Sequence, residues 1–383
     1  MRALDFGKQS GSLGHGLERR RSLWERFHID PPLLCTLLVI LAFGMMVLYS
    51  ATDGNVRELE RQAAFIGLSI VVMIGVAQVD VRFMQLWVPW AYVGGMILLI
   101  AVPLIGDVGG GAQRWLDLPG LPRFQPAETM KMIVPLSVAS LLARRAIPPN
   151  YKQVLGALIL IAMPVVLVAI QPDLGTALLI AAAGIFVLLL AGIRWKLVFA
   201  ALALGVMTIP ALWIFYLKDY QKNRIFTFLN PEGDPLGTGW NTIQAKTAIG
   251  SGGLYGKGWL NGVQSRLDFL PEGQTDFIAA VLAEEFGLVG VVFLLTLYIV
   301  IIGRGLYIGA VTQDLFSRLM AGSISLTFFV YAFVNIGMVS GLLPVVGVPL
   351  PLVSLGGTSI LTLMIGFGIL MSIHTHKETR LVY

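Results

Sequence analysis

The sequence is poor in charged residues, and cysteine and histidine are almost absent. Asp, Glu, Lys and Arg make up 13% of the 383 residues, whereas 56% are hydrophobic and the mean hydropathy is +0.79. A soluble domain carries about 25% charged residues. This chain has too few to cover a water-facing globule, which excludes an ordinary cytosolic enzyme. The single cysteine, Cys35, excludes an intramolecular disulfide and a cysteine-ligated metal site.

The sequence contains long apolar runs with few charged residues. A helix that crosses a bilayer needs roughly 20 apolar residues, and a helix satisfies every backbone polar group inside the membrane. We therefore expect an all-α integral membrane protein, a polytopic bundle of about ten transmembrane helices. The expected segments are 33–51, 62–79, 86–104, 126–143, 155–170, 174–192, 197–216, 277–302, 318–338 and 352–372.

Basic residues are distributed unevenly between the loops. Sixteen of the 27 Lys and Arg residues fall on the side that holds both termini, and four fall in the short loops of the other side. The positive-inside rule then predicts that both termini are cytoplasmic. The net charge of +5 reflects these cytoplasmic loops, so no nucleic acid partner is expected.

This map divides the chain into three parts. A basic cytoplasmic tail covers 1–32, in which Arg19, Arg20 and Arg21 are expected to contact anionic membrane lipids. The ten-helix membrane domain covers 33–376, and a cytoplasmic C-terminus covers 377–383. Within the domain, a large extracytoplasmic loop, 217–276, lies between helices seven and eight. A second outside segment, 343–357, is rich in Pro and Gly and suits a re-entrant stretch that lines a cavity.

Histidine cannot supply chemistry on the outer face of the membrane. All four histidines, His15, His28, His374 and His376, lie on the cytoplasmic side of this map. A Ser-His-Asp triad and a histidine-ligated zinc are therefore excluded on the outer face. Chemistry there must use carboxylates, amines, guanidiniums or hydroxyls.

Ionisable residues inside the membrane spans are costly and are candidates for function. In the fourth segment Glu128 and Lys131 are three residues apart, so they share a helix face and can pair. One interpretation is a structural ion pair. The other is a basic site in which Arg123, at the membrane rim, and Lys131, below it, grip a phosphate. Nearby, Trp115 is either an interfacial anchor or a platform that stacks on a sugar.

Carboxylates mark the start of the eighth segment. Asp276 lies where the long loop meets the bilayer, and partial desolvation there suits a general base. The alternative is a charge that only favours the helix N-terminus through the macrodipole. Glu284 and Glu285 lie deeper, where they must be paired or neutral, or belong to a proton path in a transporter.

The glycine-rich stretch 250–258 in the long loop gives a weaker signal. Its backbone amides can approach a phosphate, with Lys257 as the counter-charge. It fails the Walker pattern, because Ser251 occupies the first glycine position, and Tyr255 breaks the dinucleotide pattern. Surface turns are the competing interpretation.

Six short motifs follow one another between residues 111 and 357. They are Gly111-Ala112-Gln113-Arg114-Trp115, Arg123-Phe124-Gln125-Pro126 with Glu128 and Lys131, Gln171-Pro172-Asp173-Leu174-Gly175-Thr176, Gly250-Ser251-Gly252-Gly253, Leu270-Pro271-Glu272 with Thr275-Asp276-Phe277, and Pro349-Leu350-Pro351-Leu352-Val353-Ser354 with Gly356-Gly357. In this order they resemble the SEDS family (shape, elongation, division, sporulation) of bacterial membrane proteins, in its elongation branch. Ala127, Gln274 and Leu355 depart from the family pattern. Gln274 stands where a histidine is common, which argues against a required histidine beside the aspartate.

The resemblance implies a peptidoglycan glycosyltransferase of the bacterial cytoplasmic (inner) membrane, which polymerises lipid II during cell elongation and maintains rod shape. It makes Asp276 the catalytic base of an inverting transfer, in which a β-1,4 bond forms and undecaprenyl pyrophosphate leaves. Arg123 and Lys131, the latter oriented by Glu128, are the best-placed cations for the pyrophosphate. Arg114 and Lys257 are the next candidates for binding the pyrophosphate.

The resemblance also implies partners. A class B penicillin-binding protein of the elongation complex crosslinks the product, and lipid II, nascent glycan and membrane lipids are the other partners. A divalent cation, Mg²⁺ or Mn²⁺, could share the task of neutralising the pyrophosphate. No ligand cluster is recognisable in the sequence, so metal dependence is left open and the metal site is unknown. Two rival functions stay open at this point. One is a lipid II flippase in which Lys131, Glu284 and Glu285 line the crossing path, and the other is a scaffold whose loop only docks the crosslinking partner.

Overall fold

The computed structural model describes residues 27–109, 112–117, 123–144, 147–215, 222, 226–230, 233, 239–266, 270 and 272–380. Most of the predicted tail 1–32, with its arginine run, lies outside the described residues. So do residues 381–383 of the predicted C-terminus, most of the loop between 216 and 238, and Gly111 and Pro271 of two motifs. The domain boundaries predicted above therefore stay predictions.

Helices form almost the whole fold, as the composition predicts, with one short antiparallel hairpin in addition. The helices are α2 (Pro31–Ala51), α3 (Val56–Ala77), α4 (Val81–Ile105), α5 (Pro126–Ala143), α6 (Tyr151–Ile170), α7 (Leu174–Leu190), α8 (Trp195–Phe215), α10 (Trp240–Gly252), α11 (Val263–Arg266), α12 (Ile278–Val311), α13 (Leu315–Val339) and α14 (Gly357–Arg380). The hairpin consists of β1 (Asp107–Gly109) and β2 (Ala112–Trp115).

Each of the ten predicted apolar segments coincides with a helix. Within the described residues, seven helices are long and apolar enough to cross a membrane, namely α2, α3, α4, α6, α12, α13 and α14. Of the rest, α5 carries Glu128 and Lys131, and α7 has 17 residues. The chain is thus a multi-pass helical membrane protein, and the count of ten spans stays a prediction.

Several helix boundaries differ from the predicted segments; α4, for example, begins at Val81 and not at 86. α3 begins at Val56 and not at 62, because its charged first turns are helical although they are not apolar. α12 continues to Val311 but breaks at Gly287, where φ is 64° and ψ is −160°. α14 begins at Gly357 and not at 352, because the chain first turns through Leu352, whose φ is 65°.

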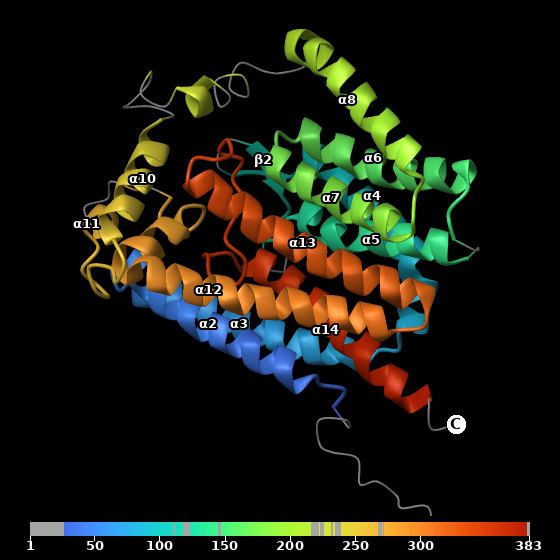
Figure 1. The fold of residues 1–383 in the computed structure, drawn as a ribbon, viewed down its shortest axis with the longest axis horizontal. Coiled ribbons are helices and arrows are strands. Elements are labelled where there is room, and N and C mark those ends of the chain that lie inside the picture. The colour runs from blue at the N-terminus through green and yellow to red at the C-terminus, as the bar shows by residue number, and fades with distance from the viewer. Residues whose placement is uncertain are drawn as a thin grey trace, which may run out of the picture.

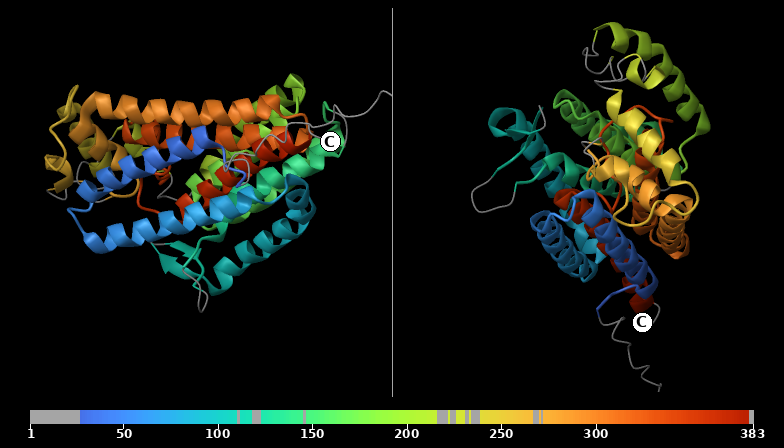
Figure 2. Two further views of the ribbon diagram at one scale, coloured as in Figure 1. Left: turned by 90° about the horizontal axis from the view of Figure 1, so that it is seen from below. Right: turned by 90° about the vertical axis from the view of Figure 1, so that its left-hand side faces the viewer.

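α13 lies at the centre of the bundle. Most of its residues are buried, and it packs against α5, α7, α12 and α14. α2 and α3 lie beside α12 and α14, whereas α4 to α7 form the opposite side of the molecule (Figures 1 and 2). α8 lies apart from this bundle at its edge (Figure 1). The central helix therefore contacts both halves.

A non-helical segment, 340–356, connects α13 to α14 and enters the bundle. Its apolar residues Val348, Leu350, Leu352 and Val353 are buried. The Tyr298 hydroxyl of α12 donates a hydrogen bond of 2.6 Å to Pro351 O within the segment. The expectation of an irregular, inward-directed stretch at 343–357 thus agrees with the fold. In the long loop, α10 covers Trp240–Gly252.

Candidate active site

Asp276 lies in a tight turn directly before α12. Gly273 N donates to Leu270 O at 2.9 Å, and Phe277 N donates to Glu272 O at 3.0 Å. Asp276 is partly buried, whereas the next residue, Phe277, is fully buried. The turn therefore places the carboxylate at the boundary between the packed helices and the loop.

The carboxylate faces segment 340–356. A Cβ atom built on Gly347 would lie 3.4 Å from Asp276 Oδ2, and Gly347 has a φ of 73°, which favours glycine. Leu355 N, further along the segment, donates to Gln274 O at 2.9 Å. Backbone contacts thus hold the turn that carries Asp276 directly against this segment.

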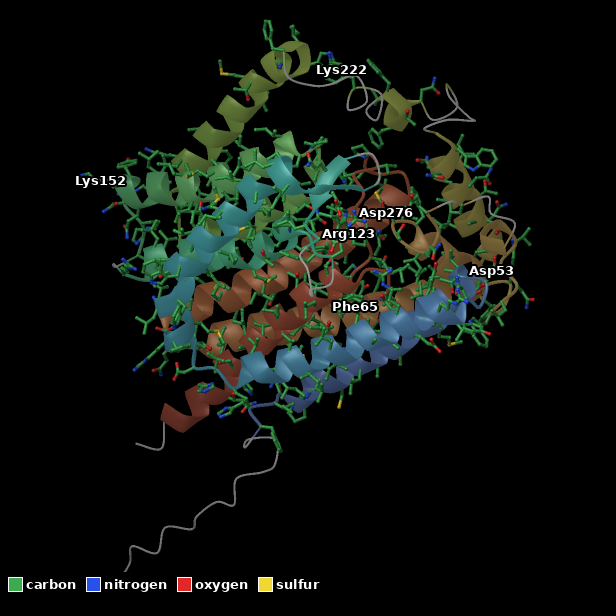
Figure 3. All side chains as sticks on the ribbon, turned by 180° about the vertical axis from the view of Figure 1, so that it is seen from behind. Asp53, Phe65, Arg123, Lys152, Lys222 and Asp276 are labelled. Carbon is green, nitrogen blue, oxygen red and sulfur yellow. The ribbon has the colours of Figure 1, made fainter. Side chains whose placement is uncertain are left out.

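Leu355 also lines a pocket of about 240 Å³. The other lining residues come from α3, β2, the chain before α5 and the start of α14, and they are Glu58, Arg61, Gln62, Phe65, Trp115, Arg123, Gly356, Gly357 and Thr358. In the view of Figure 3, Asp276, Arg123 and Phe65 are labelled near one another close to the centre of the molecule. The pocket itself combines two guanidiniums with an aromatic platform at Trp115. Asp276 is not among its lining residues, but the turn that carries Asp276 is bonded to the pocket through Gln274 O and Leu355 N.

Gln62 fixes α3 to the floor of the pocket. Its Nε2 donates to Ser354 O at 3.1 Å, and its Oε1 accepts from Gly356 N at 3.4 Å. The Gln62 side chain is buried, as are Ser69, Met73 and Ala77 of the same helix. Because Arg61 is its neighbour, this anchor also sets the position from which the Arg61 side chain reaches the pocket.

Arg123 is held loosely. Its guanidinium lies 3.2 Å from Asp107 Oδ2, and the two side chains are 44% and 48% exposed. A surface ion pair of this kind contributes about 0–1 kcal/mol, so little opposes rotation of the guanidinium toward an anion in the pocket. Two backbone hydrogen bonds between Leu116 and Phe124 keep the chain around Arg123 beside β2 and Trp115.

Lys131 and Glu128 form the pair that their spacing predicts. Lys131 Nζ lies 2.5 Å from Glu128 Oε1, and the side chains are 1% and 9% exposed. The ammonium also lies 4.9 Å from the ring centroid of Tyr331 on α13, within the range of a cation–π interaction. Lys131 is not among the pocket residues. Its contacts support the structural ion pair more than direct contact with a phosphate.

Arg114 is also engaged inside the protein. Its Nε donates to Gln171 O at 3.2 Å, and its Nη2 donates to Pro172 O. In the same motif Asp173 caps α7 through Thr176 N and accepts from Gln125 Nε2 at 2.7 Å. The motif around Pro172 is therefore a junction between β2, α5 and α7. The geometry gives no support to Arg114 as a phosphate ligand.

Lys257 pairs with a buried carboxylate. Its Nζ lies 2.7 Å from Glu284 Oε1, and the Glu284 side chain is 0% exposed. The same carboxylate accepts from the backbone amides of Val263 and Gln264. Glu284 thus fastens the chain after α10 onto α12. The charge of Lys257 is matched there and not at the pocket.

The glycine-rich stretch is bound to the break in α12. Lys257 N and Gly258 N donate to the carbonyls of Glu284 and Glu285, each at 3.0 Å. In return, Leu288 N and Val289 N donate to Gly253 O and Leu254 O at 3.0 and 3.1 Å. These amides therefore serve the helix break, and the idea that they cradle a phosphate finds no support.

Glu285 faces α2 from the same break. Its Oε1 accepts a hydrogen bond from Ser50 Oγ. Within the described part of the chain, its Oε2 is buried and has no hydrogen-bond partner. Glu284 and Glu285 are therefore held by local contacts to loop and helix.

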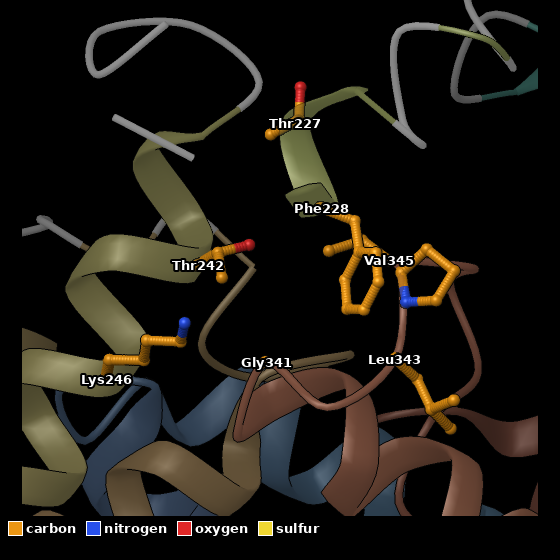
Figure 4. A pocket seen from close by; sticks show the side chains of 8 residues that line it. Thr227, Phe228, Thr242, Lys246, Gly341, Leu343 and Val345 are labelled. Atoms are coloured by element: carbon orange, nitrogen blue, oxygen red, sulfur yellow. The ribbon is translucent and has the colours of Figure 1, made fainter. Parts of the chain in front are cut away.

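A second pocket, of about 30 Å³, lies where α10 meets segment 340–356 (Figure 4). Lys246 and Thr242 of α10 line it opposite Gly341 and Leu343. A volume of this size holds about one or two water molecules, so it is too small for a sugar.

Of the cations predicted for the pyrophosphate, only Arg123 lines the larger pocket, together with the predicted Trp115. Sequence reasoning missed Arg61. Helical spacing could have found it, because Glu58, Arg61 and Phe65 recur every three or four residues and so share one face. The predicted segment began at 62 because it followed hydropathy alone.

Metal ligation remains a prediction. Among the described residues, no group of three or more His, Cys, Asp or Glu side chains is arranged to hold a metal ion. The pocket itself contributes one carboxylate, Glu58. Mg²⁺ that binds together with phosphates takes one or two protein carboxylates, so an Mg²⁺ or Mn²⁺ ion that arrives with the substrate stays an open expectation.

Fold and site together define a multi-pass helical membrane protein with a carboxylate beside an arginine-lined pocket. The family model described as "Cell cycle protein", which covers FtsW, RodA and SpoVE, matches residues 31–379. The chain belongs to this family, so the resemblance drawn from the six motifs is confirmed.

Curated relatives cover almost the whole chain. It is 53% identical over 359 residues to peptidoglycan glycosyltransferase MrdB of Escherichia coli (strain K12), which spans 94% of this chain and 97% of that protein. It is 32% identical over 375 residues to probable peptidoglycan glycosyltransferase FtsW of Geobacter metallireducens, at 94% and 99% coverage.

Solved structures agree with the fold. A chain from "Structural coordination of polymerization and crosslinking by a peptidoglycan synthase complex" is 30% identical, with a TM-score of 0.80 and coverage of 91% of this chain and 98% of that chain. The crystal structure of Rod shape determining protein RodA of Thermus thermophilus is 27% identical, with a TM-score of 0.68 and coverage of 91% and 97%.

Proposed function

We propose that this chain is a peptidoglycan glycosyltransferase that polymerises lipid II into glycan strands during cell elongation. The names of its MrdB and FtsW relatives describe that enzyme class. One observation links the proposal to particular residues of this chain. The turn that bears Asp276 is bonded through Gln274 to Leu355, and Leu355 lines the pocket that contains Arg61 and Arg123.

The reaction needs a base on one side of the sugar carbon and positive charge on the other. Lipid II presents an α-linked sugar on undecaprenyl pyrophosphate, and a β-1,4 bond inverts that carbon. Asp276 takes the proton of the acceptor 4-hydroxyl while the new C–O bond forms and the bond to the pyrophosphate oxygen breaks. Inverting glycosidases use a carboxylate base in the same position relative to the leaving group.

The leaving pyrophosphate gains negative charge as the bond breaks. Arg61 and Arg123 line the pocket and supply positive charge, and stabilising charge as it develops is among the largest contributions to catalysis. Gly357 and Thr358 begin α14 at the pocket, where the helix N-terminus favours an anion. Trp115 lines the same pocket, which supports a role in stacking on a sugar ring. Lys131, with Glu128, supports the pocket indirectly by packing α5 against α13.

Membrane topology and partner belong to the same proposal. Both termini are cytoplasmic, ten helices span the inner membrane, and the loop 217–276 is extracytoplasmic with Asp276 at its end. A class B penicillin-binding protein crosslinks the strands. The structural neighbour from a peptidoglycan synthase complex, which coordinates polymerization and crosslinking, is consistent with such a partner.

The flippase hypothesis is less well supported by the geometry. It requires Lys131, Glu284 and Glu285 to line one path for a headgroup. Lys131 is instead enclosed by Glu128 and Tyr331, and Glu284 is enclosed by Lys257 and two loop amides. The charged groups form separate local contacts, whereas the arginines gather in one pocket.

Reconstitution separates the three functions. The purified chain, with and without a class B penicillin-binding protein, is incubated in liposomes that contain fluorescent lipid II. A transferase gives a ladder of glycan strands that lysozyme digests. Movement of label across the bilayer without a ladder would indicate a flippase. Binding of the partner with neither product would indicate a scaffold.

A further inference from the structure

A buried asparagine in α13 contacts the turn of the proposed base. Asn335 is 0% exposed, and its Nδ2 donates to Asp276 O at 2.8 Å and to Val348 O at 2.8 Å. Its Oδ1 is buried and has no hydrogen-bond partner among the described residues. An amide inside an apolar helix is costly, so its two donated bonds need an explanation beyond the packing of α13.

Asn335 completes a row of three contacts. Gln274 O accepts from Leu355 N at 2.9 Å, Thr275 O accepts from Ser354 Oγ at 2.5 Å, and Asp276 O accepts from Asn335. Three consecutive carbonyls are thus fixed by groups outside the turn. The carbonyls of Gln274 and Thr275 precede the Asp276 Cα and its own carbonyl follows it, so the peptide units on both sides of this Cα are fixed, which limits where the carboxylate can point.

The same amide also holds the opposite wall. Its second bond fixes Val348, and the neighbouring Gly347 lies against the Asp276 carboxylate. α7 supports this wall, because a Cβ atom built on Gly175 would lie 2.6 Å from Val346 O and 3.1 Å from the Val348 side chain. One side chain therefore sets the spacing between the base and the loop that faces it.

We propose that Asn335 is a positioning residue for Asp276, with Ser354 as its helper, and that it holds the carboxylate at the distance that proton transfer needs. This inference rests on the proposed function. Reacting groups must lie within about 3–3.5 Å, and a displacement of 1 Å can cost about 100-fold in rate. Asn335 touches no substrate in this role, because it acts on the backbone of the base.

Single-turnover kinetics distinguish positioning from a general structural role. Asn335→Ala, Ser354→Ala and wild-type protein, each in saturating excess over labelled lipid II, are compared by rate constant, and the folded fraction of each protein is measured separately by size-exclusion chromatography. At saturating enzyme, a loss of folded protein leaves the rate constant unchanged. The matched control is Thr327→Val on the same helix. Thr327 is buried, and its Oγ1 has no hydrogen-bond partner among the described residues, so the change removes no hydrogen bond to the site.

We expect Asn335→Ala to lower the rate constant by about 100-fold with a near-normal folded fraction and unchanged lipid II affinity. Ser354→Ala should lower the rate constant less, and Thr327→Val should not lower it. If both site variants lose folded protein but keep the wild-type rate constant, the positioning role is wrong. Asp276→Asn in the same assay separates a failure of the positioning role from a failure of the proposed function. Normal polymerisation by that variant overturns Asp276 as the base.

Discussion

Arg61 and Arg123 line the same pocket, although one belongs to α3 and the other to the chain before α5. Arg61 lies in the second turn of α3, and Arg123 lies three residues before α5 begins at Pro126. α3 is fixed to the pocket floor through Gln62, and the ion pair of Arg123 among the described residues is with the exposed Asp107. The site thus combines one anchored and one loosely held cation, as expected for a pocket that receives and releases a charged group.

Arg61→Gln and Arg123→Gln should each slow polymerisation. Removal of one group that stabilises developing negative charge costs about 100- to 1,000-fold in kcat at an enclosed site, and we expect about 10-fold at these exposed positions. Arg57→Gln is the matched control, because Arg57 is an exposed arginine of α3 that does not line the pocket. Initial rates with purified protein and lipid II provide the measurement, and equal rates for all three variants would contradict the assignment.

Glu284→Ala should destabilise the protein more than Lys257→Met. The first change leaves Lys257 and two backbone amides without their acceptor, whereas the second leaves the carboxylate with both amides. Breaking a buried ion pair costs about 3–5 kcal/mol, and partial exposure of Lys257 reduces this figure. The measurements are the Tm in detergent and the rate of proteolysis between α10 and α12. Equal effects of the two variants would show that the amides contribute nothing.

Gly287→Ala should destabilise the break in α12. The φ of 64° and ψ of −160° lie in a region open almost only to glycine, and a Cβ atom there would overlap Gly256 N and Leu254 O. We expect a loss of more than about 1–3 kcal/mol. Gly303→Ala, in the regular part of α12 with no atom near its Cβ position, should be neutral. Chemical denaturation of both variants checks this, and a neutral Gly287→Ala would show that the break is dispensable.

The Glu128 and Lys131 pair should behave as one unit. Glu128→Gln and Lys131→Met each leave a buried group without its charge partner, so each should lower stability. The double variant should be more stable than the sum of the single losses predicts, with a coupling of about 0.5–3 kcal/mol. A double-mutant cycle on the free energy of unfolding measures it. Zero coupling would contradict the structural ion pair.

Most of the fold can be predicted from the sequence, because apolar runs of this length have few alternatives to helices in a membrane. Local pairs can also be predicted, as the spacing of Glu128 and Lys131 shows. The rotation of a helix about its axis, relative to its neighbours, cannot be predicted in this way. Lys131 is directed toward Tyr331 and not toward the pocket because α5 packs against α13 in that orientation.

Contacts between segments that lie far apart in the sequence could not be predicted either. The contact between Gln274 and Leu355 joins segments far apart in the sequence, and no periodicity indicates it. Asn335 did carry a signal, since an amide within an apolar segment is costly. Arg61 was missed because hydropathy placed it outside the second segment. For both residues, a polar side chain within or next to an apolar segment indicates the site, whereas hydropathy alone does not.

The role of Asp276 as the base for glycan polymerisation is tested by comparing wild-type protein with Asp276→Asn. The two purified proteins are incubated with lipid II and a class B penicillin-binding protein, after their Tm and partner binding have been shown to match. We expect glycan strands from the wild type and none from Asp276→Asn. Strands of normal length and yield from Asp276→Asn would show that Asp276 is not the base.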